Sequence, residues 1–227
     1  MAAQRARVLP PPLRNAAPRL KKKVQLYLGS PVVAIKLRAG LLRPYRRLRF
    51  QSFGAASFIH RPEWLAGVHR IAIGDDVAIL GRCWLAAERR SWSQPGPALS
   101  IGDRAAIGPF CTITAAESVV LEEDVSIAAH SFITDVDHSL GAEHAPRSPR
   151  PRLKAINANA TLIAPIRTAP IRIGRGTWIG NQVTVLHGSE IGTRCIIGAN
   201  SVVRGQIPDY SVAVGAPARV VGSTRDA

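Results

Sequence analysis

Acidic residues are missing from the N-terminal part of the chain, where the first Asp or Glu is Glu63. Thirteen of the 30 Lys and Arg lie in residues 1–50, so the formal net charge of +15 at pH 7 is concentrated there. The basic and acidic residues of the remainder nearly balance. The basicity therefore belongs to an N-terminal extension and not to the body of the protein.

Long apolar runs and paired cysteines are also missing. No segment approaches the roughly 18 apolar residues of a membrane-spanning helix. The opening stretch MAAQRARVLPPPLRN lacks the apolar core of a secretory signal. We therefore expect a cytoplasmic protein. The three cysteines, Cys83, Cys111 and Cys195, lie far apart without a CxxC motif, which argues against a zinc site and against a disulfide framework.

What the sequence does contain is a period of six residues. In IGTRCIIGANSV, residues 191–202, an aliphatic residue followed by Gly recurs after six positions. This period fits neither an α-helix nor a single strand, and it is typical of a coil of short strands joined by fixed turns. The aliphatic position i is occupied by Ile73, Ile79, Leu85, Ile101, Ile107, Ile113, Leu121, Ile127, Ile133, Ile173, Ile179, Val185, Ile191, Ile197 and Val203.

Position i+4 is small or β-branched in the eleven repeats named below, and all three cysteines occupy it. We interpret i as the residue that fills a narrow triangular prism, with i+4 packed near a corner. Glycine at i+1 is expected to relax the turn geometry. Three hexapeptides make one turn, so the regular segments predict about five turns of stacked parallel strands. The i+4 residues are Val77, Cys83, Ala105, Cys111, Val125, Ser131, Thr177, Val183, Ser189, Cys195 and Ser201.

The pattern resembles the hexapeptide-repeat acyltransferases, such as the maltose, galactoside and O-antigen O-acetyltransferases. The resemblance covers residues 54–222, where RIGRGTWIG matches the family's coil-restart motif and IPDYSVAVGAPARVVG its closing motif. It implies a mainly β fold, a single-stranded left-handed parallel β-helix. The handedness comes from the resemblance alone, because most parallel crossovers are right-handed.

Two insertions interrupt the period. The aliphatic positions Leu85 and Ile101 are 16 residues apart instead of six. A longer excursion covers residues 139–169. The excursion is rich in Pro, Ala and Arg and has no period, so we expect a loop, and loops this long are usually functional or disordered. The expected organisation is a basic, partly helical extension at 1–50, a β-helix acyltransferase domain at 51–222 and a tail at 223–227.

His138 ends the repeat VSIAAHSFITDVDHS, where the chain departs into the excursion. The family's catalytic histidine occupies this departure point, so the resemblance implies that His138 is the general base. Imidazole titrates near neutral pH and can take the proton of a hydroxyl that attacks a thioester directly, while a backbone N–H stabilises the oxyanion. Asp135 and Asp137 flank the base, and either could orient it or be a solvated loop carboxylate.

The resemblance also implies acetyl-CoA as co-substrate, with no metal. By motif matching, the donor would contact Trp178 and Asn181 from TWIGN, Ala199 from GANS, Arg204, and Arg219 from APAR. Plain packing is the alternative for Trp178, and a solvated surface side chain is the alternative for Arg219. Arg204 stands where relatives often have Thr before Lys.

The acceptor is inferred less directly. Several sugar acetyltransferases of the family carry an acceptor-contacting Asn where this chain has Gly108, which disfavours a maltose-like or galactoside-like acceptor. The prediction is an acyl-CoA-dependent O-acyltransferase, transferring acetyl to a sugar hydroxyl of a cell-envelope or extracellular glycan precursor. Because the family is generally trimeric, a homotrimer with sites between subunits is expected. The cations of the excursion suggest an anionic acceptor; they are Arg147, Arg150, Arg152, Lys154 and Arg167, against Glu143.

The basic extension has features of a helix. Ser30 followed by Pro31 is a typical helix start, and Pro44 would end the helix near Arg43. Apolar residues among cations would let residues 20–50 lie on an anionic membrane as a peripheral contact, or cap the open end of the coil. No fold motif supports nucleic-acid binding.

Three other functions remain open at this point. An N-acetyltransferase acting on an amino-sugar nucleotide would look alike on the donor side, and a non-catalytic β-helix could serve as a scaffold or binding module. A γ-class carbonic anhydrase needs an HxxxxH pair, whereas His130 and His138 are eight residues apart and His138 and His144 are six apart. Neither the acceptor nor the choice between acetyl and other short acyl groups can be read from the repeat.

Overall fold

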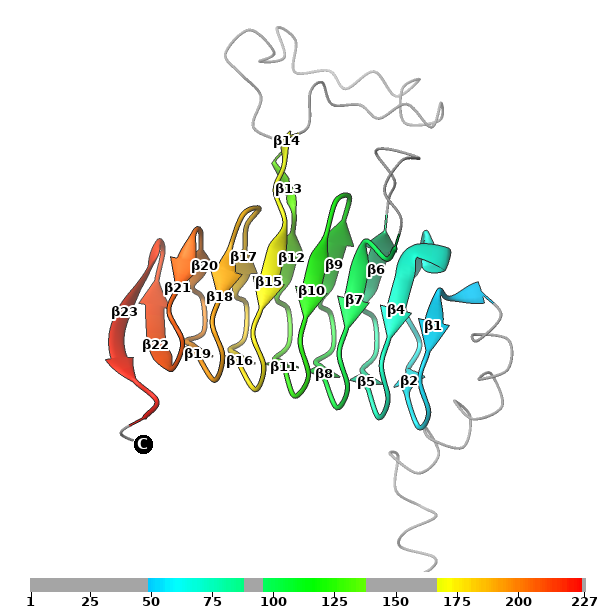
Figure 1. Cartoon of the computed structure of the whole chain (residues 1–227), viewed down its shortest axis with the longest axis horizontal. Coiled ribbons are helices and arrows are strands. Elements are labelled where there is room, and N and C mark those ends of the chain that lie inside the picture. Colours follow the sequence, from blue (N-terminus) through cyan, green and yellow to red (C-terminus); the bar gives the residue numbers. More distant parts are fainter. Residues whose placement is uncertain (1–48, 88–95, 138–166, 226–227) are drawn as a thin grey trace, which may run out of the picture. The chain divides into compact units, whose positions relative to one another are not determined.

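The structure, a computed structural model, describes residues 49–87, 96–137 and 167–225. In these ranges the chain winds into a coil of short strands, three to a turn, which form three parallel sheets (Figure 1). Sheet A contains β1 (Ser52–Phe53), β4 (Ile71–Ile73), β7 (Leu99–Ile101), β10 (Val119–Leu121), β15 (Ile171–Ile173), β18 (Glu190–Ile191) and β21 (Gln206–Ile207).

Sheets B and C form the other two faces of the prism. Sheet B contains β2 (Phe58–Ile59), β5 (Ala78–Ile79), β8 (Ala106–Ile107), β11 (Ser126–Ile127), β16 (Trp178–Ile179), β19 (Ile196–Ile197), β22 (Ser211–Gly215) and β23 (Ala218–Ser223). Sheet C contains β3 (Trp64–Ala66), β6 (Trp84–Ala87), β9 (Thr112–Ala115), β12 (Phe132–Thr134), β17 (Thr184–Val185) and β20 (Val202–Val203). Within sheet B, the last pair, β22 with β23, is antiparallel and the others are parallel. A parallel β-helix is therefore confirmed, and its left-handedness stays a prediction.

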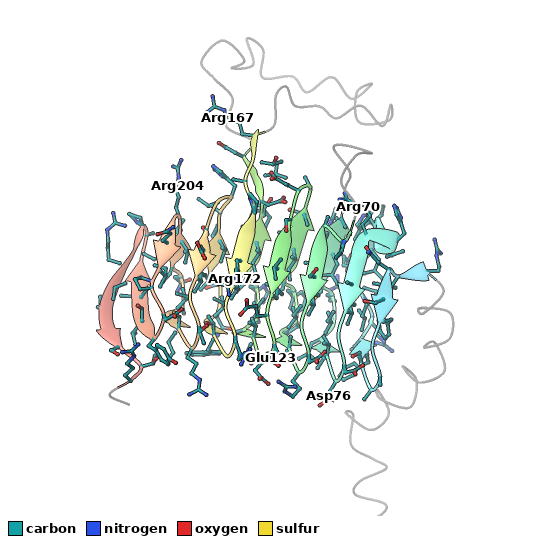
Figure 2. The ribbon with its side chains drawn as sticks, viewed as in Figure 1. Arg70, Asp76, Glu123, Arg167, Arg172 and Arg204 are labelled. Atoms are coloured by element: carbon teal, nitrogen blue, oxygen red, sulfur yellow. The ribbon has the colours of Figure 1, made fainter. Side chains whose placement is uncertain are left out.

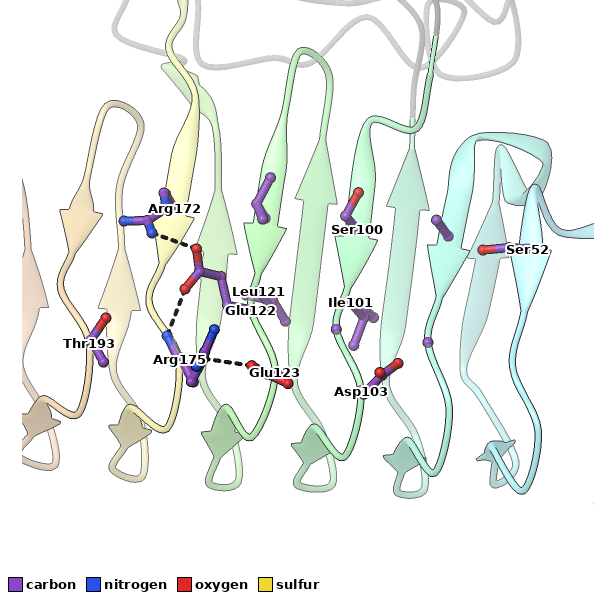
Figure 3. Close-up of a pocket in the computed structure, with 14 residues that line it drawn as sticks. Ser52, Ser100, Ile101, Asp103, Leu121, Glu122, Glu123, Arg172, Arg175 and Thr193 are labelled. Atoms are coloured by element: carbon purple, nitrogen blue, oxygen red, sulfur yellow. Dashed lines mark hydrogen bonds and ion pairs between the residues drawn. The ribbon is translucent and has the colours of Figure 1, made fainter.

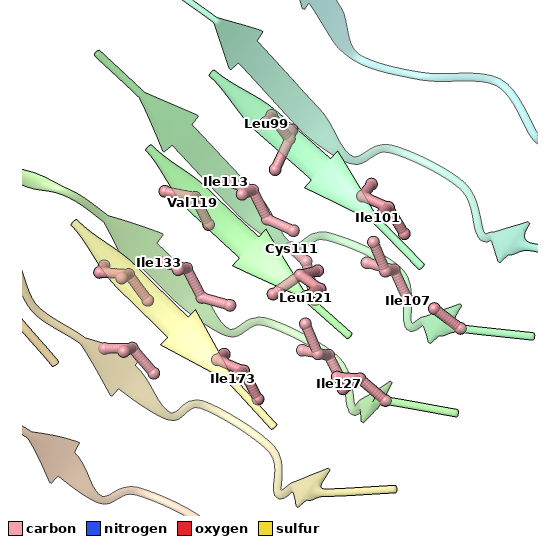
Figure 4. Close-up of a cluster of buried hydrophobic side chains, with 14 of the residues drawn as sticks. Leu99, Ile101, Ile107, Cys111, Ile113, Val119, Leu121, Ile127, Ile133 and Ile173 are labelled. Carbon is pink, nitrogen blue, oxygen red and sulfur yellow. The ribbon is translucent and has the colours of Figure 1, made fainter. Parts of the chain in front are cut away.

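The aliphatic row fills the prism as the period predicts. Every predicted i residue is at most 3% exposed, and these side chains meet along the coil axis (Figure 4). Sheet A has seven strands where about five turns were expected. The extra turns lie at the two ends of the coil. In the first turn Phe53 takes the aliphatic position, and in the last turn Ile207 and Ala213 are buried before the β22–β23 hairpin closes the coil.

The small residues at i+4 do more than fit a crowded corner. The Ser131 hydroxyl donates to the Gly180 carbonyl at 3.0 Å, and the Thr177 hydroxyl donates to the Gly192 carbonyl at 2.7 Å. The Cys111 thiol likewise donates to the Ala128 carbonyl at 3.0 Å. These buried groups bond each coil to the next, because a donor withdrawn from water must be paired.

The glycines at i+1 have a different role from the predicted one. Left-handed backbone occurs two residues later, for example at Asp76 and Arg104, and not at these glycines. A Cβ added to Gly102 would lie 2.6 Å from the backbone of Glu122, and one added to Gly192 would lie 2.5 Å from the backbone nitrogen of Asp209. Glycine is needed because the next coil passes too close for any side chain.

The three edges of the prism differ in regularity. The A/B edge is formed by the turns from sheet A to sheet B, and the B/C edge by the turns from sheet B to sheet C. Both of these edges repeat one short turn along the coil. The C/A edge contains the 3₁₀ helix η2 (Val68–Arg70) and both insertions, since the chain leaves sheet C after β6 and again after β12. No helix among the described residues is long and apolar enough to span a membrane.

Candidate functional site at the C/A edge

The long excursion is rooted in a two-stranded ribbon on the C/A edge. After β12 the chain forms β13 (Val136–Asp137), which pairs antiparallel with β14 (Arg167–Thr168) on its return (Figure 1). The end of the excursion, expected as a loop, is therefore a strand, because the outgoing backbone supplies its hydrogen-bond partners. His138 follows Asp137 directly and lies outside the described residues.

Asp135 attaches the start of this ribbon to the preceding coil. Its side chain is fully buried and accepts hydrogen bonds from the backbone N–H groups of Ala116, Glu117 and Ser118 at 2.7–2.8 Å. Burial raises the pKa of the Asp135 carboxyl, and the three N–H donors act in the opposite direction. Both carboxylate oxygens are engaged by the neighbouring turn, so the observed contacts of Asp135 tie the exit point to the preceding coil.

Asp137 faces a histidine that the sequence analysis did not select. Its Oδ2 lies 3.6 Å from Nε2 of His187, and both side chains are about one-fifth exposed. His187 belongs to the turn after β17, one coil further along, and the Gly188 N–H donates to the Ala169 carbonyl at 3.0 Å. The pairing crosses the excursion, so spacing along the sequence gave no signal for it.

Arg204 lies on the same edge in the following coil. The two turns stack through backbone bonds, since the Leu186 N–H donates to the Val203 carbonyl at 3.0 Å. Figure 2 shows Arg204 and Arg167 projecting from this edge. The C/A edge thus carries an acid–histidine pair with exposed cations beside the root of the excursion.

The other predicted donor contacts fall elsewhere on the coil. Asn181 and Ala199 meet on the B/C edge, where the Asn200 N–H donates to the Asn181 carbonyl at 2.9 Å. Trp178 lies on the outer face of sheet B, 49% exposed. Arg219 lies on β23 opposite Val214, and its Nη1 donates to the Ala218 carbonyl. A single copy of the coil therefore does not gather the five residues at one point.

Trp178 lies on the opposite side of the prism from the exit ribbon, which is the β13–β14 pair where the chain leaves the coil. In a triangular cross-section, the C/A edge is opposite the face formed by sheet B. Figure 1 shows β13 and β14 along one margin of the coil and β16 along the other. Within one copy, Trp178 therefore cannot approach the exit ribbon.

A shallow groove follows the outer face of sheet A (Figure 3). At one end it is lined by small residues such as Ser52 and Ser100, and at the other by an ionic network. In that network Glu122 accepts from Arg172 and from the backbone N–H of Arg175, while Arg175 pairs with Glu123. These charges satisfy one another, so the network holds coils together and does not present free charge to a ligand.

Metal ligands do not gather in the described ranges. No group of three His, Cys, Asp or Glu side chains there is arranged to hold a metal ion. His130, a residue considered for a carbonic anhydrase site, instead stacks on Phe110 with ring centroids 4.8 Å apart.

The fold defines the class: a parallel β-helix of hexapeptide repeats with one irregular edge. The family model for the bacterial transferase hexapeptide (six repeats) matches residues 170–205. Residues 170–205 therefore carry the hexapeptide repeat of bacterial transferases.

Two relatives are similar over about half of the chain. One is the probable acetyltransferase Rv3034c of Mycobacterium tuberculosis, 37% identical over 123 residues, which are 54% of this chain and 36% of that protein. The other is the putative lipopolysaccharide biosynthesis O-acetyl transferase WbbJ of Escherichia coli, 34% identical over 122 residues, 52% of this chain and 57% of that protein. The chain thus spans less than two thirds of either relative.

Solved structures share the fold. A variant of AntD, an N-acyltransferase from Bacillus cereus in complex with dTDP and coenzyme A, matches 79% of this chain and 87% of its own with a TM-score of 0.63 and 17% identity. The acetyltransferase VCA0836 of Vibrio cholerae, complexed with acetyl coenzyme A, matches 86% of this chain and 90% of its own with a TM-score of 0.51 and 18% identity.

Proposed function

We propose that the protein is an acyl-CoA-dependent acetyltransferase that acylates a sugar hydroxyl of a cell-envelope or extracellular glycan precursor. The observation that carries the proposal is the C/A edge, where a regular coil opens into the β13–β14 ribbon and Asp137 of that ribbon faces His187 of the next coil. The names of the two relatives, an acetyltransferase and an O-acetyl transferase, support the reaction.

In the proposed mechanism, His138 is the general base. As the acceptor oxygen attacks the acyl carbon, its proton passes to the imidazole, and the carbon–sulfur bond then breaks to release coenzyme A, whose sulfur takes up a proton. No covalent enzyme intermediate is needed. Asp135 would hold the strand that leads to His138, and Asp137 with His187 would fix the ribbon to the next coil.

The donor contacts require a second copy of the chain. Because Trp178 lies opposite the C/A edge, a site that uses both must join sheet B of one copy to the C/A edge of another. This geometry supports the expected homotrimer, with acetyl-CoA bound between subunits near Trp178, Asn181, Ala199, Arg204 and Arg219. The left-handed sense of the coil, the cytoplasmic location and the membrane or capping role of residues 20–50 remain predictions.

The reaction is tested by mass spectrometry of envelope glycans from cells with and without the gene. The proposal predicts an acetyl mass difference that mild alkali removes, since esters are base-labile. An alkali-stable acetyl group would identify N-acetylation of an amino sugar instead. Identical glycans from both strains would contradict acyl transfer to this class of acceptor.

A further inference from the structure

Two of the three buried cysteines occupy equivalent positions in neighbouring coils. Cys83 lies in the turn between β5 and β6, and Cys111 lies in the turn between β8 and β9. The strands on both sides are in unbroken register, because β5 pairs with β8 and β6 pairs with β9. Cys83 and Cys111 therefore share one corner of the prism, one coil apart, and Figure 4 shows Cys111 inside the coil.

The separation of these two residues suits a disulfide. Neighbouring parallel strands lie about 4.8 Å apart, and the Cα atoms that a disulfide joins are usually ~4.4–6.8 Å apart. The two backbones are bonded at this point, since the Trp84 N–H donates to the Cys111 carbonyl at 2.9 Å. The Cys83 and Cys111 side chains are also within hydrogen-bonding contact of each other. The coils therefore do not have to move for the two sulfurs to join.

Packing alone does not require sulfur in this corner. The Cys83 thiol donates to the Gly108 carbonyl of the next coil at 3.1 Å, and the Cys111 thiol makes the equivalent bond one coil further along. Ser131 follows in the same corner and makes this bond with a hydroxyl, which is a better donor than a thiol. What separates the two cysteines from serine is that they can be oxidised together.

Cys195, the third cysteine of the chain, lacks such a partner. It lies on the A/B edge, where the equivalent positions of the two neighbouring coils are Thr177 and Ser211. Its backbone N–H donates to the Thr177 hydroxyl at 3.0 Å, and its thiol donates to the Pro208 carbonyl at 3.0 Å. Cys195 is as buried as the other two, so it serves as a matched control for them.

We propose that Cys83 and Cys111 form a reversible disulfide when the protein meets hydrogen peroxide. In the first step one thiolate attacks a peroxide oxygen, the O–O bond breaks, and the released hydroxide takes up the thiol proton as water, leaving a sulfenic acid. The second thiol then attacks the sulfenic sulfur, the S–S bond forms, and a second water leaves. Two thiols are oxidised and one peroxide is reduced, and a small-molecule dithiol returns both cysteines to thiols.

Cys83 is the better suited of the two to attack the peroxide. The hydrogen bond from the Cys111 side chain lowers the pKa of the Cys83 thiol, and the same contact raises the pKa of Cys111. The thiolate is the reactive form of cysteine, so Cys83 would attack first and Cys111 would complete the bridge.

Burial sets the rate of this reaction. Both side chains are at most 1% exposed, so the oxidant reaches them when the coil opens locally. β5 is the second strand from the N-terminal edge of sheet B, near the end of the coil, where each turn has fewer neighbours to hold it. The bridge would close a loop from residue 83 to residue 111 and so hold the first coils together. No residue proposed for acyl transfer takes part, so this inference and the proposed function can fail separately.

The test starts from the full-length reduced protein, which is treated with hydrogen peroxide and then alkylated with iodoacetamide in denaturant. Intact-mass spectrometry should find all three cysteines alkylated before oxidation and Cys195 alone alkylated afterwards. Proteolytic fragments that contain Cys83 and Cys111 should be joined to each other. The melting temperature should rise by about 5 °C and should return to its initial value with dithiothreitol.

Three serine variants complete the test. Cys195→Ser should form the bridge and gain the same stability as the parent, whereas Cys83→Ser and Cys111→Ser should do neither. Serine suits this corner, as Ser131 shows, and the results for the parent and Cys195→Ser decide the question even if one of the other variants misfolds. Three alkylated cysteines in the oxidised parent, a bridge that includes Cys195 or joins two chains, or a bridged protein that melts below the reduced one would each overturn the inference.

Discussion

The A/B and C/A edges of the coil are built from the same repeat but differ in what holds them. On the A/B edge each turn is bonded to the next by side chains. The Asp103 carboxylate accepts from the backbone N–H of Asp75 at 2.8 Å, and the Asp209 carboxylate accepts from Thr193 at 2.7 Å. Arg104 bonds Asp124 in the next coil and holds the pKa of that carboxyl below its usual range.

The C/A edge contains the departures from the period. There the chain forms η2, leaves the coil twice and places Asp137 against His187 across an insertion. A regular edge propagates the coil, because each turn is specified by its neighbours. An edge that tolerates insertions can carry a site without disturbing the core, so the comparison separates the residues that build the coil from those that we propose act on a substrate.

The largest expected effect comes from the coil interior. Ile191→Asp places a carboxylate at a fully buried position with no partner, which costs several kcal/mol, enough to prevent folding. The variant should be insoluble or lack the cooperative melt of the parent in circular dichroism. A soluble variant with the parental melting temperature would contradict the inward register of the repeat.

Shortening the excursion tests the role of the C/A edge in acceptor recognition. Residues 142–166 replaced by a Gly-Ser linker should leave the coil folded and acetyl-CoA binding intact, because the residues proposed to contact the donor lie outside the excursion. Transfer to the native glycan should be lost. If the excursion's cations recognise an anionic acceptor, added salt should also raise the acceptor KM of the parent protein. Undiminished transfer by the shortened protein would remove the excursion from acceptor recognition.

Two glycine substitutions test whether close contact between coils stabilises the A/B edge. Gly192→Ala on the A/B edge should destabilise by about 1–3 kcal/mol, because the added Cβ meets backbone atoms of the next coil. Gly222→Ala in β23 is the matched control, since its Cβ meets only the Val212 side chain at 3.8 Å. Chemical denaturation measures both. Equal stability of the two variants would show that close coil contact is not what requires glycine.

The smallest effect is expected for the acid–histidine pair. His187→Gln should lower kcat about tenfold, less than the 10²–10⁴ of a general base, and should change the pH profile of kcat while acetyl-CoA affinity holds. Asp137→Asn should produce a similar loss, and the double variant should be no worse than either, as expected for a coupled pair. A parental rate and pH profile for His187→Gln would reduce the pair to a structural contact.

The repeat could be predicted from the sequence because inward aliphatic side chains recur at fixed spacing. The first turn was missed because Phe53 replaces an aliphatic residue, and β14 was missed because its partner strand is β13, on the other side of the excursion. Local spacing also could not reveal the pairing of Asp137 with His187, or that Trp178 and the exit ribbon face opposite ways. These features depend on which edge of the prism each turn occupies.

The most direct test of the account is the acyl-transfer rate of purified His138→Ala, measured with its melting temperature and acetyl-CoA affinity. If the chemistry resides at the exit from the C/A edge, kcat should fall by roughly 10² or more while melting and donor binding stay at parental values. Transfer at the parental rate would contradict the account, and His144 would then be the next histidine to test.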